Sequence, residues 1–502
     1  MDNAKQIKLG AAISYIAIFI NITAMLIYTP WMKNQIGMSN YGLYTLANSF
    51  ITMFLVDFGI GSSVARFAAK YRAQNDINAI NRLMGLVCKI FLVIDLAIFS
   101  LLAILFFFIE NIYMGLTGAE QEQFKVIYVI IAGFSVISFP FTTLNGMFNA
   151  YERFVPLKLC DLGQKLLGIV CVVAALCLDM GVTAVVFVNA FSGLVFIVIK
   201  VIYLQRNTPV RPDFRVKDRA LLKEILGFSI WVMVLGIAQR LTYNIAPSIL
   251  GIFSDSDEIA IYSPASAIAG YFYTFATAIN GLFLPTISRK IAVNREDDIL
   301  PLMIKVGRFQ VVVLGLLFAG FVSVGREFMV LWMGEEFMPA YACVILLTLP
   351  TIFEYSQQIA NTTILAKNKV SYQSMGLLAS SVINVVLSSA LSKHYGAAGV
   401  SAGICVTAFL NLIWLNVVYK RVLKIDIVQF YRKCYPTIVA PILLTIGVAF
   451  AVDRIMPERL TWGRLIIKGF ISVVIFGVAV LLVHVSREER ASIADKIRTR
   501  RK

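Results

Sequence analysis

Charged residues are scarce in this sequence. They make up 15% of its 502 residues, whereas 59% of the residues are hydrophobic, and the mean hydropathy is +0.79. A soluble globular domain carries about 25% charged and about 45–50% apolar residues. The composition therefore argues against a soluble domain and indicates a polytopic membrane protein.

Histidine and paired cysteine are also lacking. The chain has 2 histidines and 7 cysteines, and no two cysteines stand in a C-x-x-C arrangement. Both histidines fall near the ends of apolar segments without a neighbour at metal-ligand spacing, and most cysteines fall inside such segments. This pattern is typical of small core residues and argues against a disulfide framework or a metal site. We expect no metal and no cofactor.

Long polar stretches are missing as well. Without a nucleotide-binding loop or a large polar domain, an ATP-driven pump is disfavoured. The formal net charge of +16 would suggest nucleic acid as a partner if the basic residues formed a patch on a soluble surface. They lie instead in loops between apolar segments, so we expect no nucleic-acid binding. Because the loops expected outside the membrane are short, we do not expect an enzyme with a catalytic external loop.

Apolar segments long enough to cross a bilayer recur along the whole chain. A crossing helix needs about 20 predominantly apolar residues, and the segments predict an all-α polytopic fold with about fourteen transmembrane helices. Basic residues gather in every second loop. By the positive-inside rule this alternation predicts that the N- and C-termini are both cytoplasmic.

An internal repeat divides the chain into two halves. Two sequence words recur at one offset: Gly181-Val182-Thr183-Ala184 as Gly399-Val400-Ser401-Ala402, and Gly42-Leu43-Tyr44 as Ala260-Ile261-Tyr262. A nearly constant offset over much of the chain predicts two pseudo-symmetric six-helix bundles around a central cavity, in the parallel-repeat arrangement of some secondary transporters. The predicted parts are an N-terminal lobe (1–205), a basic cytoplasmic linker (206–225), a C-terminal lobe (226–420), two extra transmembrane helices (421–485) and a basic cytoplasmic tail (486–502).

One intramembrane cation is the leading site candidate. The apolar segment from Leu226 to Phe253 carries Arg240 near its middle. An arginine at the centre of a spanning helix costs at least ~2.5 kcal/mol and therefore faces a partner or a water-filled cavity. At helical spacing Tyr243 and Asn244 share its face. Two interpretations stay open: a structural arginine neutralised by a neighbouring helix, and an anion site in a transport path.

Other polar residues of the apolar segments extend this candidate site. The repeat places Asn21 opposite Arg240. A helical stripe of Glu354, Gln357, Gln358 and Asn361 has a counterpart in the other half that includes Asn145, and Glu354 is the expected counter-ion of Arg240. Candidates for ion coupling are Glu354, Asp57 and Asp95. For Lys200 and Lys468 the sequence does not decide between a snorkelling side chain and one that lines a path.

Several short motifs carry a resemblance to a known family. They are Asn40-Tyr41-Gly42-Leu43-Tyr44, then Asp57-Phe58-Gly59-Ile60-Gly61 with Arg66, Asn149-Ala150-Tyr151-Glu152-Arg153-Phe154, Leu331-Trp332-Met333-Gly334-Glu335-Glu336-Phe337 and Tyr395-Gly396-Ala397-Ala398-Gly399. In their order and spacing they resemble the polysaccharide-biosynthesis membrane proteins, the O-antigen and capsule flippases of the multidrug/oligosaccharidyl-lipid/polysaccharide exporter superfamily. The resemblance covers nearly the whole chain.

The resemblance implies alternating access in a bacterial cytoplasmic (inner) membrane, with an undecaprenyl-pyrophosphate-linked oligosaccharide as cargo. Membrane lipids and polysaccharide assembly proteins are the further partners it suggests. Related flippases have a cavity rich in arginine, whereas this chain has Asn21 in its first helix. The anion site therefore depends more heavily on Arg240, and on Arg66 near the cytoplasmic mouth. Coupling to H+ or Na+ and transport driven by the membrane potential alone both stay open, as does a cation-coupled multidrug antiporter of the same fold.

Overall fold

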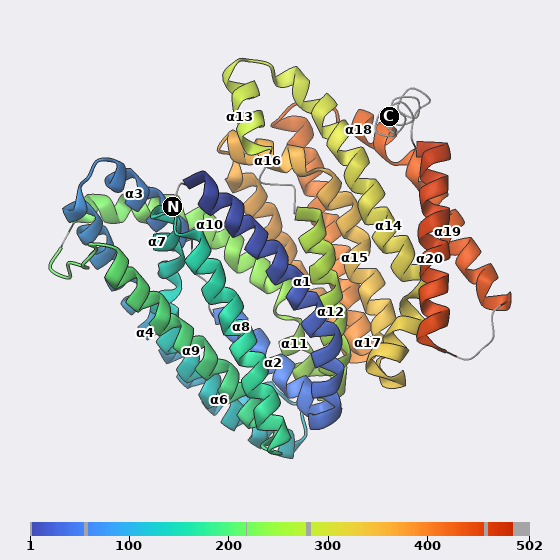
Figure 1. Ribbon diagram of the computed structural model, residues 1–502, viewed down its shortest axis with the longest axis horizontal. Coiled ribbons are helices and arrows are strands. Elements are labelled where there is room, and N and C mark those ends of the chain that lie inside the picture. The colour runs from blue at the N-terminus through green and yellow to red at the C-terminus, as the bar shows by residue number, and fades with distance from the viewer. Residues whose placement is uncertain (1–2, 55–58, 217, 278–282, 456–459, 485–502) are drawn as a thin grey trace. The chain divides into compact units, whose positions relative to one another are not determined.

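The predicted all-α membrane fold is confirmed. The structure is a computed structural model that describes residues 3–54, 59–216, 218–277, 283–455 and 460–484 (Figure 1). These residues form helices, turns and loops without a strand. Within the described ranges, nine helices are long and apolar enough to cross a membrane, or ten if a bent pair within residues 219–243 counts as one span. The chain is therefore a multi-pass membrane protein, and about fourteen spans fit this fold.

The chain forms two compact units. Unit 1 consists of Met1–Ala260 and Leu377–Gly396, and unit 2 of Ile261–Gly376 and Ala397–Lys502. These units group residues by how closely they pack, whereas the lobes were predicted from a sequence repeat. The predicted lobe and linker boundaries therefore stay a prediction, and the basic tail lies beyond residue 484, outside the described residues.

Unit 1 is built mainly from the first half of the chain. Its helices are α1 (Asn3–Ile36), α2 (Met38–Phe54), α3 (Ile60–Ala73), α4 (Ile77–Phe107), α5 (Ile109–Ile112), α6 (Gly118–Ser138), α7 (Leu144–Ala150), α8 (Phe154–Cys177), α9 (Gly181–Asn207), α10 (Arg219–Tyr243) and α11 (Ala246–Phe253). Helices α8 and α9 run side by side, and α8 also packs against α1 (Figure 1). Residues 377–396 add the first part of α17 (Val370–Arg421) to this unit.

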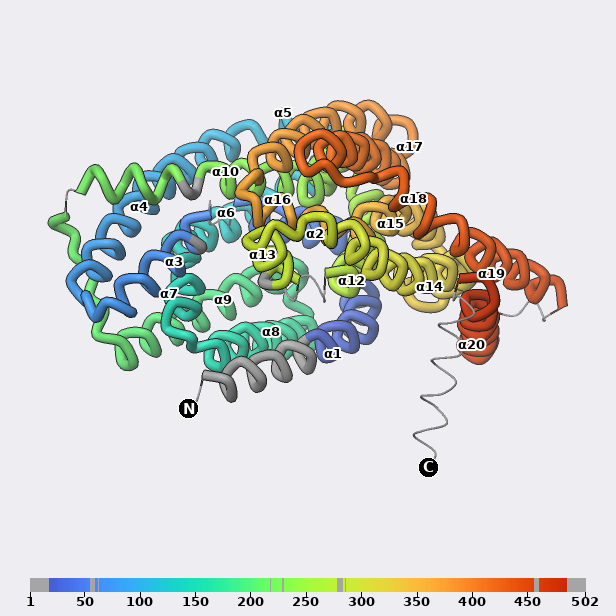
Figure 2. The backbone as a smooth tube through the Cα atoms, turned by 90° about the horizontal axis from the view of Figure 1, so that it is seen from above, coloured from blue at the N-terminus to red at the C-terminus, as the bar shows by residue number. Residues whose placement is uncertain are grey.

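Unit 2 is organised around one long helix. Its elements are most of α12 (Ser256–Thr277), α13 (Leu284–Ala292), α14 (Ile299–Met333), α15 (Ala340–Ser356), α16 (Gln358–Ala366), the rest of α17, α18 (Ile427–Cys434), α19 (Pro436–Ile455) and α20 (Trp462–Ala479). Helix α14 packs against α15, α19 and α20, and the last two lie against each other, as Figure 2 also shows. Leu314, Phe318 and Phe476 are among the buried side chains at this junction.

The outer faces of these helices are apolar. In α4, Val93 is 71% and Leu96 is 67% exposed, and contact of such apolar side chains with water is unfavourable. Lipid tails are as apolar as leucine, so these faces gain nothing from further burial in protein. The helices are instead held by close packing and by buried hydrogen bonds.

Helix breaks repeat in the two halves of the chain. In unit 1 the helix that starts at Gly118 is interrupted by a 3₁₀ turn at Phe139–Thr143 before α7 continues. In unit 2 the corresponding helix is interrupted at Gln357, between α15 and α16. Asn145 and Asn361 correspond at an offset two residues shorter than that of the other recurring motifs, and this offset brings the two breaks to the same place. The sequence repeat is therefore a repeat of local structure.

A glycine allows the sharp bend in α17. Gly396 has φ +50° and ψ −131°, inside a helix that otherwise runs through both predicted spans of this region. A Cβ on Gly396 would lie 2.3 Å from the carboxylate of Glu258 in the same unit. Glycine is therefore favoured here for its backbone angles, whereas the Glu258 carboxylate is the end of a flexible side chain and can move aside.

Candidate functional site

Arg240 lies at a helix break in unit 1. The predicted segment from Leu226 to Phe253 is not one continuous helix, because α10 ends at Tyr243 and α11 begins at Ala246 with Pro247 in its first turn. The Arg240 Nη1 donates to Asn244 Oδ1 at 3.4 Å. The Asn244 backbone N–H donates to the Arg240 carbonyl at 2.9 Å. The predicted association of Arg240 with Asn244 is therefore present, at the point where the helix ends.

A buried asparagine from a distant part of the chain supports this break. Asn384 of α17 is 1% exposed, and its Nδ2 donates to the carbonyls of Leu241 at 3.2 Å and Thr242 at 3.4 Å. Ser388 Oγ donates to Asn384 Oδ1 at 3.0 Å. These carbonyls belong to the last turn of α10, where carbonyl groups have no partner within the helix. Asn384 therefore fixes the turn that carries Arg240, and no sequence pattern indicated this role.

The other candidates of unit 1 lie on separate helices. Asn21 is half-buried on α1, Arg66 is exposed on α3, and Tyr243 is 46% exposed at the end of α10. Asn145 is exposed on α7, where its Oδ1 accepts from Lys200 Nζ at 3.5 Å. That Asn21, Arg66 and Arg240 serve one anion site stays a prediction.

Lys200 is one of the two lysines the sequence left undecided. It is 9% exposed on α9, and its Nζ lies 2.9 Å from Asp161 Oδ1 of α8. Asp161 also has Lys158 Nζ at 4.0 Å from its other oxygen. Lys200 is therefore an ion-paired cation inside unit 1, next to the predicted site residue Asn145.

Of the three ion-coupling candidates, two can be placed. Asp95 is half-buried on α4, and its Oδ1 is a buried acceptor without a hydrogen-bond partner in the described part of the chain. Asp57 lies outside the described residues. Glu354 is half-buried on α15 in unit 2. Its predicted pairing with Arg240 stays a prediction, because the two residues belong to different units.

The polar stripe of unit 2 is gathered at the break between α15 and α16. Gln357 is 1% exposed and Gln358 6% exposed, while Asn361 is half-buried. The Gln357 Nε2 donates to the hydroxyl of Tyr431 at 2.7 Å. The predicted stripe therefore points at least partly into unit 2, where α18 supplies a partner for it.

A buried cluster of four charges in unit 2 was missed by the sequence analysis. Lys468 Nζ lies 3.1 Å from Glu327 Oε1 and 2.6 Å from Asp453 Oδ1, and Arg464 Nη2 lies 3.4 Å and 3.1 Å from the same two oxygens. The cluster joins α14, α19 and α20 and is neutral in sum. A lysine inside the last apolar segment was the one available signal, and its partners come from two other helices.

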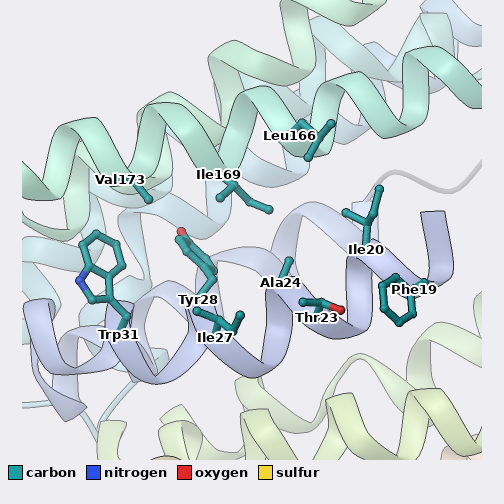
Figure 3. A pocket seen from close by; sticks show the side chains of 10 residues that line it. All are labelled: Phe19, Ile20, Thr23, Ala24, Ile27, Tyr28, Trp31, Leu166, Ile169 and Val173. Carbon is teal, nitrogen blue, oxygen red and sulfur yellow. The ribbon is translucent and has the colours of Figure 1, made fainter. Parts of the chain in front are cut away.

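An apolar groove lies between α1 and α8 of unit 1. It encloses a volume of about 450 Å³. In Figure 3 the side chains of Leu166, Ile169 and Val173 point from α8 towards α1. From α1 the lining includes Ile27 and Trp31, and almost all of the lining surface is carbon. Such a surface suits a hydrocarbon chain and offers nothing to a charged group.

The comparisons with known proteins agree with this architecture. The family model described as "Polysaccharide biosynthesis protein" matches residues 8–289. A structure of "Lipid II flippase MurJ, inward closed conformation" matches with a TM-score of 0.75 at 13% identity, covering 94% of this chain and 98% of that one. A search of curated protein sequences finds no match.

Two further structures are transporters. A multidrug resistance MATE family transporter of the MOP superfamily, in an inward-facing conformation, matches with a TM-score of 0.64 at 15% identity, covering 80% of this chain and 95% of that one. A MOP superfamily transporter from Pyrococcus furiosus matches with a TM-score of 0.57 at 14% identity, covering 84% and 96%. At these identities the likeness establishes the fold.

Proposed function

Because the chain belongs to the polysaccharide biosynthesis protein family and has the fold of the MOP superfamily, we propose that it is a flippase for a polyprenyl-pyrophosphate-linked oligosaccharide. It moves the repeat unit of an O-antigen, capsule or exopolysaccharide from the cytoplasmic to the outer face of a bacterial cytoplasmic membrane by alternating access, with both termini in the cytoplasm. The family match over residues 8–289, joined to the fold of a lipid II flippase, is the observation that carries the proposal.

The cargo explains why a protein is needed. A sugar head group and a diphosphate cannot cross hydrocarbon unaided, because each unpaired polar group costs several kcal/mol there. The polyprenyl tail is apolar and can remain in the lipid. The groove between α1 and α8 offers it a carbon-lined surface on the same helix that carries Asn21.

Arg240 is the residue we assign to the diphosphate. A guanidinium binds a phosphate in a two-pronged fork that a lysine cannot reproduce. Its position near the end of α10 leaves it at a helix break. Asn244 and Tyr243 flank it, and Asn21 and Arg66 are assigned to the same path, with Gln357, Gln358, Asn361 and Asn145 as sugar-binding candidates.

Transport outwards is energetically favourable for this charge. With a negative cytoplasm, moving two phosphate charges out gains ~4 to 5 kcal/mol per 100 mV, at about 2.3 kcal/mol per charge. The potential alone would therefore be a sufficient driving force, and coupling to H+ or Na+ is the alternative. Chemistry of this kind needs no cofactor and breaks no bond in the cargo.

The alternative is a cation-coupled multidrug antiporter, which the likeness to the MATE family transporter favours. Its cargo calls for acidic and aromatic walls, so an intramembrane arginine argues against it. Drug resistance on overexpression would support the antiporter. Accumulation of lipid-linked oligosaccharide on the cytoplasmic face after gene deletion would support the flippase.

The proposed role of Arg240 is tested by expressing its variants in a strain from which the gene is deleted. Arg240→Ala should fail to clear the accumulated lipid-linked oligosaccharide while reaching normal abundance, and Arg240→Lys should restore flipping in part. Arg206→Ala, an exposed arginine in the last turn of α9, is the matched control and should behave as wild type. Full flipping by Arg240→Ala would remove Arg240 from the site.

A further inference from the structure

A stretch of chain between two helices of unit 1 is held against a third. The linker segment, residues 208–216, runs from the end of α9 towards the start of α10 (Figure 1). Thr208 and Arg211 each precede a proline, and a residue in that position is kept out of the helical region. Thr208 has φ −136° and ψ 147°, which is extended backbone. The sequence therefore favours an extended linker segment over a further helical turn.

Three residues of α4 receive the linker segment. Asn81, Gly85 and Lys89, spaced by four, share one face of this helix, and we call them the docking stripe. The Arg211 N–H donates to Asn81 Oδ1 at 2.7 Å, and the Asp213 N–H donates to the Asn81 carbonyl at 3.0 Å. Asn81 therefore accepts from alternate N–H groups of the linker segment, as suits an extended chain.

The middle of the docking stripe has no side chain. A Cβ on Gly85 would lie 1.8 Å from the carbonyl oxygen of Asp213 and 2.4 Å from its carbonyl carbon. Both are backbone atoms, so they cannot turn aside as the tip of a side chain can. Glycine inside a helix lowers the stability of that helix. Gly85 therefore leaves the space in which the linker segment lies, at the expense of local helix stability.

Lys89 completes the docking stripe at its other end. Its Nζ donates to the Val216 carbonyl at 2.7 Å, although the two residues are 127 positions apart in the sequence. Val216 comes two residues before Asp218, whose carboxylate accepts from the Ala220 and Leu221 N–H groups at the start of α10. The contact between Lys89 and Val216 therefore places the chain just before α10 begins.

The helix that begins here carries Arg240. Asn384 holds the last turn of α10, and the linker segment leads into its first turn. We propose that Asn81, Gly85 and Lys89 are positioning residues for Arg240: they hold the linker segment on α4 and so fix the start of α10 within unit 1. The proposal deepens the proposed function and rests on it for the effect on flipping, whereas docking of the linker segment is measured without transport.

Docking is tested by proteolysis. The full-length protein in detergent micelles is treated with trypsin, and cleavage after Arg215 is followed by mass spectrometry. Arg215 is exposed, and its N–H donates to Asp213 Oδ1 at 2.9 Å. We expect Gly85→Ala to raise the rate of this cleavage at least tenfold. Gly133→Ala, also inside a helix but with nothing within 4 Å of the added Cβ, is the matched control and should leave the rate unchanged. Equal rates in the two variants would overturn the proposal.

Positioning is tested through Lys89. Lys89→Met keeps a long apolar stem but has no donor for the Val216 carbonyl, so it should reduce flipping at least tenfold at normal abundance. Lys89→Arg retains a donor and should restore flipping in part. Flipping at the wild-type rate by Lys89→Met would overturn the role of the docking stripe.

A cross-link separates positioning from contact with the cargo. In the Lys89→Met protein, Asn81→Cys and Arg211→Cys are joined by a bis-methanethiosulfonate spacer, which ties the linker segment to α4 without the ammonium group. We expect the cross-linked protein to regain flipping and to lose it when the spacer is reduced. The two single-cysteine variants, treated alike, are the controls, because the chain has 7 cysteines of its own. A cross-linked protein that stays inactive would show that Lys89 acts on something other than the linker segment and would overturn the proposal.

The two proposals fail separately. A protein whose linker segment is released by Gly85→Ala, but whose wild-type form flips no lipid-linked oligosaccharide, would retain the docking and lose the proposed function. A protein that flips the oligosaccharide equally well with the linker segment docked and released would retain the function and lose the positioning role.

Discussion

Removal of Lys468 should strongly destabilise unit 2. The Lys468 side chain is 3% exposed and bridges Glu327 of α14 and Asp453 of α19. Lys468→Met keeps a long apolar stem but deletes the charge. Glu327 and Asp453 would then share Arg464 alone, and the four-charge cluster would change from neutral to one net negative charge.

The size of the loss follows from the burial of the partners. Breaking a buried ion pair by removing one member costs about 3–5 kcal/mol, because the other charge stays without compensation. Glu327 is 11% exposed, but Asp453 is 33% exposed and retains some contact with its surroundings. We therefore expect the lower end, about 3 kcal/mol. Lys468→Met with Asp453→Asn restores neutrality and should recover part of the loss.

The free energy of unfolding is measured by reversible denaturation in mixed micelles, together with the abundance of each variant in the membrane. Lys367→Met is the control, because Lys367 lies 2.7 Å from a Glu296 that is 46% exposed. Exposed pairs contribute about 1 kcal/mol or less. If Lys468→Met cost no more than Lys367→Met, or if the double variant were less stable than the single one, the reasoning from burial and charge balance would be refuted.

Three further outcomes are expected. Asn384→Leu leaves the Leu241 and Thr242 carbonyls without their donor and should cost about 1–3 kcal/mol in unfolding free energy while reducing flipping; normal flipping would remove Asn384 as the support of Arg240. Gly396→Ala should lower the thermal midpoint, because its φ is +50° and its Cβ would meet Glu258, whereas Gly133→Ala, with nothing within 4 Å, should not. Ala24→Phe should fill the groove between α1 and α8 and slow flipping at normal abundance, with Ala24→Ser as the control; equal rates would show that the tail does not use the groove.

Several local features could be predicted from sequence because they depend on short-range pattern. Apolar runs long enough to span a bilayer predicted the fold class, and short motifs that recur in both halves of the chain predicted the repeat. Asn244 was correctly placed with Arg240 because the two are one helical turn apart. The break that ends α10 was missed, since Pro247 alone does not show which turn will be interrupted.

Contacts between helices that are far apart in the sequence could not be predicted from it. Asn384 stands among several serines in an apolar segment, and nothing in the sequence relates it to Leu241. Lys200 and Lys468 were visible as intramembrane charges, but their partners Asp161 and Glu327 come from other helices. A charged residue in an apolar segment indicates that a partner exists, but it does not identify that partner.

The amino-acid sequence by itself determined that this chain is a helical membrane protein with an internal repeat, because burying backbone polar groups in lipid leaves helices as the structure that apolar runs of this length can adopt. The tertiary structure decided which charges neutralise each other and which side chains meet at the break between α15 and α16. Those choices depend on how helices pack side by side, where a few ångströms separate a paired charge from an unpaired one.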